Sequence, residues 1–209
     1  MRGLSLIAAL VLAVGCAPTV PSGYSAAEGD VVFQSLPRSP LVDAIEGATK
    51  CPLSHCGIVV ERGEELYVLE AFGSVRETPL PDWILRGRDQ AFMACRLIEG
   101  ARSMASPMVD AARRMAGQPY DYHYAFDNGA IYCSELVYLA FKEASGRPIG
   151  STTLLRNLNW KPFEGFISEL ESGEVPLDRE MITPRGLIEA PELRVVFNQG
   201  FDGLVPAVK

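Results

Sequence analysis

Histidine is scarce in this chain, whose 209 residues include His55 and His123 and no other histidine. A nucleophilic thiol or hydroxyl that needs an imidazole base therefore has two candidates. Basic residues are also few, with 19 Lys and Arg against 26 Asp and Glu, a formal net charge of -7 and a pI near 4.9. Because phosphate binding needs clustered Lys and Arg, and no basic stripe is visible, we expect no nucleic-acid partner.

The chain also lacks an internal repeat, a low-complexity block and an apolar run of the ~20 residues that a transmembrane helix needs. Hydrophobic residues make up 48% and charged residues 22%, close to the average of globular proteins. A chain of 209 residues is long enough for one domain with a sizeable core and a short extension. We expect a single domain that is a monomer.

The N-terminus has the pattern of an export signal over residues 1–16. Arg2 supplies the positive charge, Leu4 to Val14 form a short apolar segment, and small residues precede Cys16. The segment resembles a bacterial lipoprotein signal, in which Cys16 is diacylated and anchors the protein to the membrane. Ala13 stands where such signals usually have leucine, so ordinary cleavage near Ala17 is the alternative. Either reading predicts an exported protein, facing the periplasm or the cell surface.

Residues 17–28 are rich in Pro, Ser and Gly and are expected to form a flexible tether. The domain is then expected to span residues 29–209, with its motifs within 29–145. The segment 146–209 carries no motif that assigns it a role, and we expect it to cap the cleft and to select the substrate.

Hydrophobic periodicity and turn residues predict the elements of the domain. Strands are expected over Gly29–Gln34, His55–Val60, Glu65–Ala71, Phe92–Leu97 and, at a sheet edge, Glu192–Phe197. Helices are expected over Ser39–Thr49 with Ser39 as N-cap, Pro81–Arg86 with Trp83 and Ile84 in the core, Ser106–Ala116 with Ser106 as N-cap, Cys133–Ala144 closed by Gly146, and Phe163–Leu170. The segment Gln118–Asn128 is expected to be a loop. This mixture of hairpins and helices predicts an α+β fold around an antiparallel sheet.

The stretch around Cys133 is the strongest indication of chemistry. Loop-like residues precede this cysteine and a helix-forming run follows it, so Cys133 is expected at a helix N-terminus. The free N–H groups and the macrodipole at that end favour the thiolate, which is the nucleophilic form of cysteine. A buried thiol on the apolar face of the helix is the alternative reading.

His55 and Glu70 are expected to act together with Cys133. They lie on the two strands of the predicted hairpin, at positions that share one face. A carboxylate there can orient the imidazole and stabilise the imidazolium, as a cysteine hydrolase requires. Strand alternation places Cys56 on the opposite face.

Other readings of the remaining His and Cys residues stay open. His123 is a rival base, although its place in a Tyr-rich loop suggests that it shapes the cleft. Cys56 and Cys95 fit small buried hydrophobes, and a disulfide that involves Cys51 is an alternative. A zinc site from Cys51, His55, Cys56 and His123 is a further alternative, but its spacing matches no standard C-x2-C pattern.

Four blocks carry a resemblance to a known family. They are Gly29–Gln34, Ser54–Val59 with His55, Val68–Ala71 followed by Thr78–Leu80, and Gly117–Asp121 leading to Cys133. In this order the chain resembles a papain-fold cysteine hydrolase of the NlpC type, in the circularly permuted, YiiX-like group, because the histidine strand precedes the cysteine helix.

The resemblance implies a papain-like fold with Cys133 as nucleophile, His55 as general base and then acid, and Glu70 as the orienting residue. It also implies that the hydroxyl of Tyr120 helps the backbone N–H of Cys133 to stabilise an oxyanion. Neither a metal nor an organic cofactor is implied. Relatives act on muropeptide amides, on lipid amides and esters, or transfer acyl groups.

We therefore expect an exported hydrolase that attacks an amide or ester carbonyl of an envelope peptide or lipid through an acyl-enzyme on Cys133. Peptidase or amidase, acyltransferase and thiol lipase activities all fit this description. The alternative is an envelope-binding module that kept the fold without the catalysis.

Overall fold

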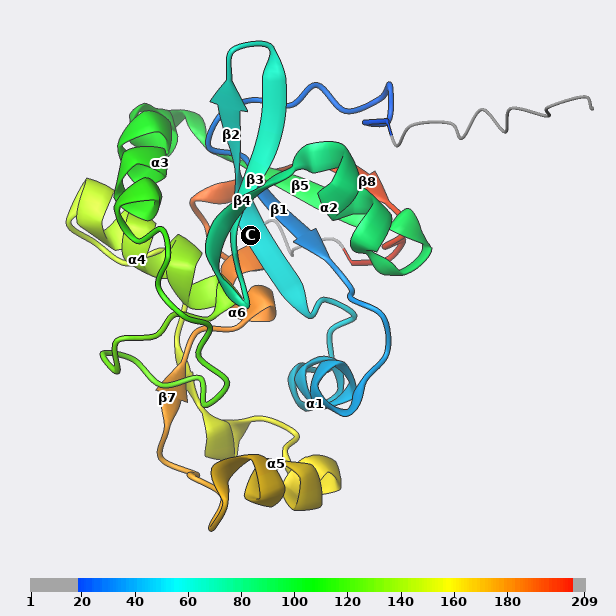
Figure 1. Cartoon of the computed structure of the whole chain (residues 1–209), viewed down its shortest axis with the longest axis vertical. Helices are drawn as coiled ribbons and strands as arrows, with labels where there is room; N and C mark the ends of the chain where they lie inside the picture. Colours follow the sequence, from blue (N-terminus) through cyan, green and yellow to red (C-terminus); the bar gives the residue numbers. More distant parts are fainter. Residues whose placement is uncertain (1–18, 205–209) are drawn as a thin grey trace, which may run out of the picture.

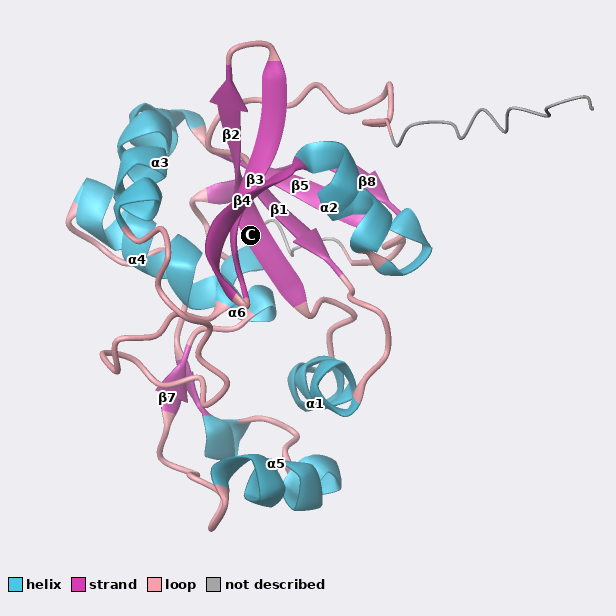
Figure 2. Cartoon of the chain, in the orientation of Figure 1, coloured by secondary structure: helices cyan, strands magenta, loops and turns pink. Residues whose placement is uncertain are grey.

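The computed structural model of the chain describes residues 19–204. The expected signal, with Cys16 and its lipidation, lies outside the described residues. Within them, the chain folds around one antiparallel sheet of six strands in the order β4-β3-β2-β1-β5-β8, with a separate two-stranded sheet β6-β7 (Figures 1 and 2). The strands are β1 Val31–Gln34, β2 His55–Arg62, β3 Glu65–Phe72, β4 Ser74–Pro79, β5 Phe92–Leu97, β6 Thr153–Leu154, β7 Glu180–Met181 and β8 Leu193–Gln199.

Helices cover both faces of the sheet and one end of it (Figure 1). The α-helices are α1 Pro40–Thr49, α2 Leu80–Arg86, α3 Ala105–Arg114, α4 Cys133–Ser145, α5 Glu164–Glu171 and α6 Pro184–Ile188. Single 3₁₀ turns or short 3₁₀ segments lie at Arg88–Gln90, Glu99–Met104, Leu155–Asn157 and Lys161–Phe163.

Strand alternation divides the core into two layers. Cys56, Ile58 and Val60 of β2 point to the layer that contains α3 and α4. Val59, between them, points to the layer that contains Trp83 of α2. Burial of both faces explains why β2 reads as a nearly continuous apolar run, and it fixes which side chains can meet at each end of the sheet.

Local signals of the sequence predicted most of the elements correctly. Ser39 caps α1 by accepting a hydrogen bond from the backbone N–H of Val42 at 3.2 Å. Gly146 ends α4 with a φ of 73°, a backbone conformation that glycine adopts without strain. The hairpin β2-β3, the edge strand β8 and the helix α5 also lie where they were expected.

One strand of the main sheet was missed and one expected helix cap was wrong. The strand β4 was not predicted, although it pairs along β3 and completes the sheet edge. Ser106 does not cap α3, because a 3₁₀ segment runs into the helix and Met104 occupies the cap position. The hydroxyl of Ser106 instead donates to a carboxylate oxygen of Glu28 at 3.0 Å, so the residue serves a tertiary contact.

The packed part of the chain begins before Gly29, inside the segment expected to be a tether. Tyr24 is buried against Phe92 and Phe197, and its hydroxyl donates to the carboxylate of Asp30 at 2.9 Å. The same buried carboxylate accepts from the Nε of Arg96 at 2.7 Å. This buried network fastens residues 24–30 to β5.

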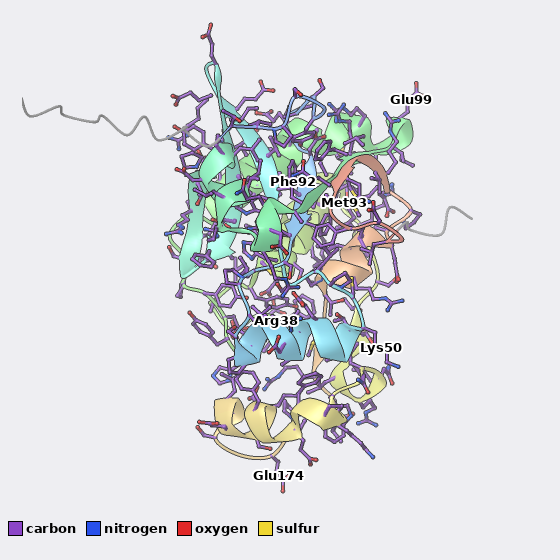
Figure 3. The ribbon with its side chains drawn as sticks, turned by 90° about the vertical axis from the view of Figure 1, so that its right-hand side faces the viewer. Arg38, Lys50, Phe92, Met93, Glu99 and Glu174 are labelled. Carbon is purple, nitrogen blue, oxygen red and sulfur yellow. The ribbon has the colours of Figure 1, made fainter. Side chains whose placement is uncertain are left out.

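The segment after α4 forms a layer at one end of the molecule. Figure 3 shows α1, which runs between the labelled residues Arg38 and Lys50, with the segment that includes Glu174 on the side away from the sheet. Helices α1 and α5 are in contact there. Among the helices described in residues 19–204, we find none with the length and apolar character needed to cross a bilayer.

Candidate active site

Cys133 is the first residue of α4. Tyr132 before it is extended, with φ -96° and ψ 168°, and its backbone N–H donates to the carboxylate of Glu135 at 3.3 Å. Leu136, Val137 and Ala140 bury the inner face of the helix. The apolar face therefore fixes the helix against the sheet, and the thiol sits at the end where N–H groups and the macrodipole favour an anion.

His55 is the first residue of β2 and is 2% exposed. Its Nε2 lies 2.5 Å from a carboxylate oxygen of Glu70, and the Cys133 thiol is close enough to be the largest influence that raises the pKa of the ring. With Nε2 at Glu70, Nδ1 is the ring nitrogen that faces the thiol. The Cys133 Sγ also lies 4.0 Å from the carbonyl oxygen of Ser54. The structure thus brings together Cys133, His55 and Glu70.

Hairpin register explains how His55 and Glu70 meet. Ile58 of β2 pairs with Leu69 of β3. Continuing this antiparallel register places Glu70 of β3 opposite Gly57 of β2. His55 lies two residues before Gly57 on β2, so its side chain is on the same face as that position. A Cβ at Gly57 would lie 3.2 Å from the Cβ of Glu70. Because glycine has no side chain, the imidazole and the carboxylate meet diagonally across this position.

Glu70 is buried completely and has two further partners that the sequence did not reveal. The Thr78 hydroxyl donates to its Oε1 at 2.6 Å, and the Arg86 guanidinium from α2 forms an ion pair with its Oε2. Arg86 also stacks 4.1 Å from the centre of the Phe72 ring. These contacts satisfy a carboxylate that would otherwise be costly to bury.

The hydrogen bonds and charges of the site favour a thiolate–imidazolium pair. Burial lowers the pKa of His55, but hydrogen bonds to Cys133 and Glu70 outweigh it and raise that pKa to about 9. Burial raises the pKa of Glu70, but His55 and Arg86 outweigh it and lower that pKa to about 2. The pKa of Cys133 is lowered by a hydrogen bond from the Cys56 thiol and, against burial, by His55.

Cys56 therefore does more than fill the core. It points to the α4 side of the sheet, as alternation predicted, and it is buried there. Its thiol and its backbone N–H lie beside the sulfur of Cys133 and lower the pKa of that thiol. The same contact raises the pKa of Cys56, together with burial, which is the larger cause. Only the tertiary packing of α4 reveals this role.

Tyr120 lies in the cleft beside His55, and its hydroxyl is 3.3 Å from that of Tyr124. Burial, with the negative charges of the neighbourhood, raises the pKa of Tyr120, so the hydroxyl stays neutral and able to donate. The backbone N–H of Tyr120 donates to the carbonyl of Gly73 at 3.0 Å. The loop that carries Tyr120 is thereby fixed to the turn between β3 and β4.

His123 is separate from this cluster. Its side chain is 52% exposed, and its Nδ1 lies 3.2 Å from Glu171, which also pairs with Arg179. His123 lines a cavity whose wall also includes Cys133, and the ring contact that the structure gives it within residues 19–204 is to Glu171.

The four described cysteines are free thiols, so the alternative disulfide at Cys51 is not formed. Burial raises the pKa of Cys51 to about 11 and that of Cys95 to about 12, which makes both poor nucleophiles at neutral pH. Within residues 19–204, no group of three or more His, Cys, Asp or Glu side chains is placed to hold a metal ion. The alternative zinc set is not assembled.

Comparison with known proteins points in one direction. The family model described as a permuted papain-like amidase enzyme, YaeF/YiiX, C92 family, matches residues 25–197. The uncharacterized protein YiiX of Escherichia coli (strain K12) is 32% identical over 172 residues, which cover 80% of this chain and 84% of YiiX. A crystal structure described as metalloprotein yiiX from Escherichia coli O157:H7 is similar with a TM-score of 0.78 and 30% identity, covering 84% of this chain and 99% of that one.

Proposed function

Because the chain belongs to the permuted papain-like amidase family of YaeF and YiiX, we propose that it is a cysteine amidase with Cys133 as nucleophile. The family and the α+β fold expected from the sequence are confirmed. The observation that carries the proposal is the buried row formed by Cys133 at the start of α4, His55 at the start of β2 and the Glu70 carboxylate 2.5 Å from the imidazole. This row supplies a nucleophile, a base and an orienting group.

In the first half of the reaction, the Cys133 thiolate attacks the amide carbonyl carbon. The negative oxygen that forms is stabilised by the Cys133 backbone N–H and by the neutral hydroxyl of Tyr120. The His55 imidazolium then gives its proton to the amide nitrogen, the C–N bond breaks and the amine leaves. The acyl group remains on Cys133 as a thioester.

In the second half, neutral His55 takes a proton from a water molecule, which attacks the thioester carbonyl. The C–S bond breaks, the carboxylic acid leaves and the thiolate–imidazolium pair is restored. Glu70 stays ionised throughout and holds the imidazole in place, with Thr78 and Arg86 fixing the carboxylate. An amine that replaced water would make the same intermediate an acyl donor.

Thiol reactivity tests the proposal. We expect the purified protein to react with iodoacetamide at Cys133 first, faster than a free cysteine at pH 7, and the His55→Ala variant to react much more slowly. Labelled positions are read by peptide mass spectrometry, and buried Cys95 is the internal control. An unactivated Cys133 would favour the binding module instead.

Capture of the intermediate tests catalysis directly. Incubation with a cell-envelope extract followed by acid quench should leave an acyl adduct on Cys133, which intact-protein mass spectrometry detects. The Cys133→Ser variant should lose thioester formation and turnover while keeping its melting temperature. A His55→Ala protein that folds and keeps full activity would contradict the assigned roles.

We also propose that the enzyme is exported and anchored through a lipid on Cys16. The proposal rests on the pattern of residues 1–16. Cys16→Ser should move the protein from the membrane fraction to the soluble fraction of the envelope, as measured by fractionation and immunoblotting. Unchanged membrane retention would be evidence against lipidation.

A further inference from the structure

A narrow cavity, here called the slot, lies between α1 and the segment after α4 and includes Cys133 in its wall. Most of its lining is aliphatic or aromatic. The apolar residues come from α1 (Leu41, Ala44, Ile45, Ala48), from α5 (Phe166, Ile167, Leu170) and from neighbouring segments (Leu155, Leu158, Met181, Ile182). The slot therefore runs from the buried thiol to the helix α5.

The dimensions of the slot suit a thin occupant. Its volume is about 90 Å³, yet 21 residues line it. A second cavity, here called the cleft, has a volume of about 420 Å³ and 13 lining residues. With more residues around a much smaller volume, the slot is narrower than the cleft.

Polarity of the slot suits an uncharged occupant. Within α5, every residue of which the structure describes, none is buried, and its apolar side chains lie half-exposed along the slot. Covering such surface is favourable by about 25 cal/mol per Å². The charged residues in the lining are paired with one another, because Glu171 accepts from Arg179 at 3.0 Å and lies 3.2 Å from His123.

The slot and the cleft are lined by different residues of the catalytic pair. Of the described residues, Cys133 lines the slot but not the cleft, whereas His55 lines the cleft but not the slot. Ser54 lines both, so they adjoin at the site. In a thiol amidase the acyl group stays on the cysteine, and the leaving amine takes its proton from the histidine.

We propose that the substrates are amides of long unbranched acids, with the acyl chain in the slot and the amine portion in the cleft. This assignment rests on the proposed function. The cleft is lined by the rings of Phe72, Tyr120 and Tyr122 and by Arg86, and is wide enough for a ring-sized amine. Chain length is selected on the Cys133 side and amine identity on the His55 side.

Acyl amides of 7-amino-4-methylcoumarin with acetyl, butanoyl, octanoyl and dodecanoyl chains test the proposal on the full chain. We expect kcat/KM to rise with chain length, by about tenfold or more from acetyl to dodecanoyl. Ala48→Leu adds bulk to the slot wall and should lower kcat/KM for dodecanoyl by about tenfold, with butanoyl changed less than about twofold. Ala48 is half-exposed, so this change spares the core.

Matched variants separate the two cavities. Ala116→Leu, at an exposed position that lines neither cavity, should leave the whole series unchanged. Tyr122→Ala, in the cleft, should change the preference among amines without changing the preference among chains. Ala44→Leu provides a second slot variant, and a thermal melt of each protein checks that it folds.

The outcomes distinguish this inference from the function beneath it. If Cys133 cleaves the acetyl amide as well as the dodecanoyl amide, the slot assignment is wrong and the amidase proposal stands. Chain-length dependence that survives both Ala48→Leu and Ala44→Leu would also overturn it, because the chain would then bind elsewhere. If no amide is cleaved and no adduct forms on Cys133, the amidase proposal fails and the slot assignment falls with it.

Discussion

At the scale of single residues, Glu70 sets the protonation of His55. Against burial, the Cys133 thiol and this carboxylate together raise the pKa of His55 to about 9, so the imidazolium persists through neutral pH. We expect kcat/KM to fall above pH 9, where the ring loses its proton. Glu70→Gln should move this alkaline limb to lower pH, because the variant removes a negative charge and leaves the Arg86 cation beside the ring. Full pH profiles of both proteins measure the shift.

A matched variant tests whether charge is the cause. Thr78→Val removes the hydroxyl that donates to Glu70 but keeps the carboxylate. Its alkaline limb should stay close to that of the unmodified protein. An unmoved limb in Glu70→Gln would mean that the carboxylate does not control the titration of the pair.

A second buried carboxylate, Glu135, makes the unfolding free energy depend on pH. Burial raises its pKa from 4.5 to about 8, although the Tyr132 N–H partly opposes this. The folded protein therefore keeps a proton that the unfolded chain releases, so the unfolding free energy contributed by this group falls as pH rises from 4.5 to 8. Glu135→Gln should be more stable than the unmodified protein at pH 8, by about 1 kcal/mol or more.

Urea unfolding at pH 4.5 and pH 8 measures this effect. The two proteins should differ least at the lower pH, where Glu135 is protonated largely in both folded and unfolded states. Glu143→Gln, an exposed change on the same helix, is the control and should show no such pH dependence. Equal stabilities of Glu135→Gln and the unmodified protein at pH 8 would refute the assignment.

At the scale of elements, the hairpin β2-β3 depends on Gly57. A Cβ there would lie 2.4 Å from Cγ1 of Val68 and 2.9 Å from the carbonyl oxygen of Leu69. Gly57→Ala should cost about 1–3 kcal/mol of unfolding free energy. It should also reduce activity, since the strands would separate where His55 and Glu70 meet. Urea unfolding together with amide hydrolysis measures both effects.

Gly100→Ala is the control for this change, because no atom lies within 4 Å of the added Cβ and its φ is not positive. It should alter stability by less than about 0.5 kcal/mol. A Gly57→Ala protein as stable and active as the control would show that β2 and β3 can adjust without disturbing the site.

At the scale of the whole molecule, the sequence predicted what depends on neighbouring residues. Short-range interactions explain three correct predictions: the Ser39 cap of α1, the end of α4 at Gly146, and the strand alternation that puts His55 and Glu70 on one face of the hairpin. The α+β architecture followed from the order of such elements. The residues beside Cys133 likewise predicted its position at a helix N-terminus.

The remaining partners of the site come from contacts between distant segments. Cys56 meets Cys133 only because α4 packs over β2, and Arg86 reaches Glu70 only because α2 crosses the opposite face. Ser106 shows the opposite error, since its local pattern predicted a cap but a contact with Glu28 prevailed. The apolar residues of α5 predicted a helix, but they did not predict that this helix faces α1 across the slot.

Ile182 joins the slot to the catalytic helix. Its backbone N–H donates to the Tyr132 hydroxyl at 3.0 Å, and its carbonyl accepts from the Ser134 hydroxyl at 2.9 Å. Ile182 is thus hydrogen-bonded to the residues on both sides of Cys133. Its side chain also lines the slot. We therefore expect occupancy of the slot and the position of the thiol to be thermodynamically linked, and such linkage is reciprocal. An acyl chain that stabilises these two hydrogen bonds should slow hydrogen exchange at the Ile182 amide. A change that weakens the two hydrogen bonds should in turn lower the affinity for the acyl chain.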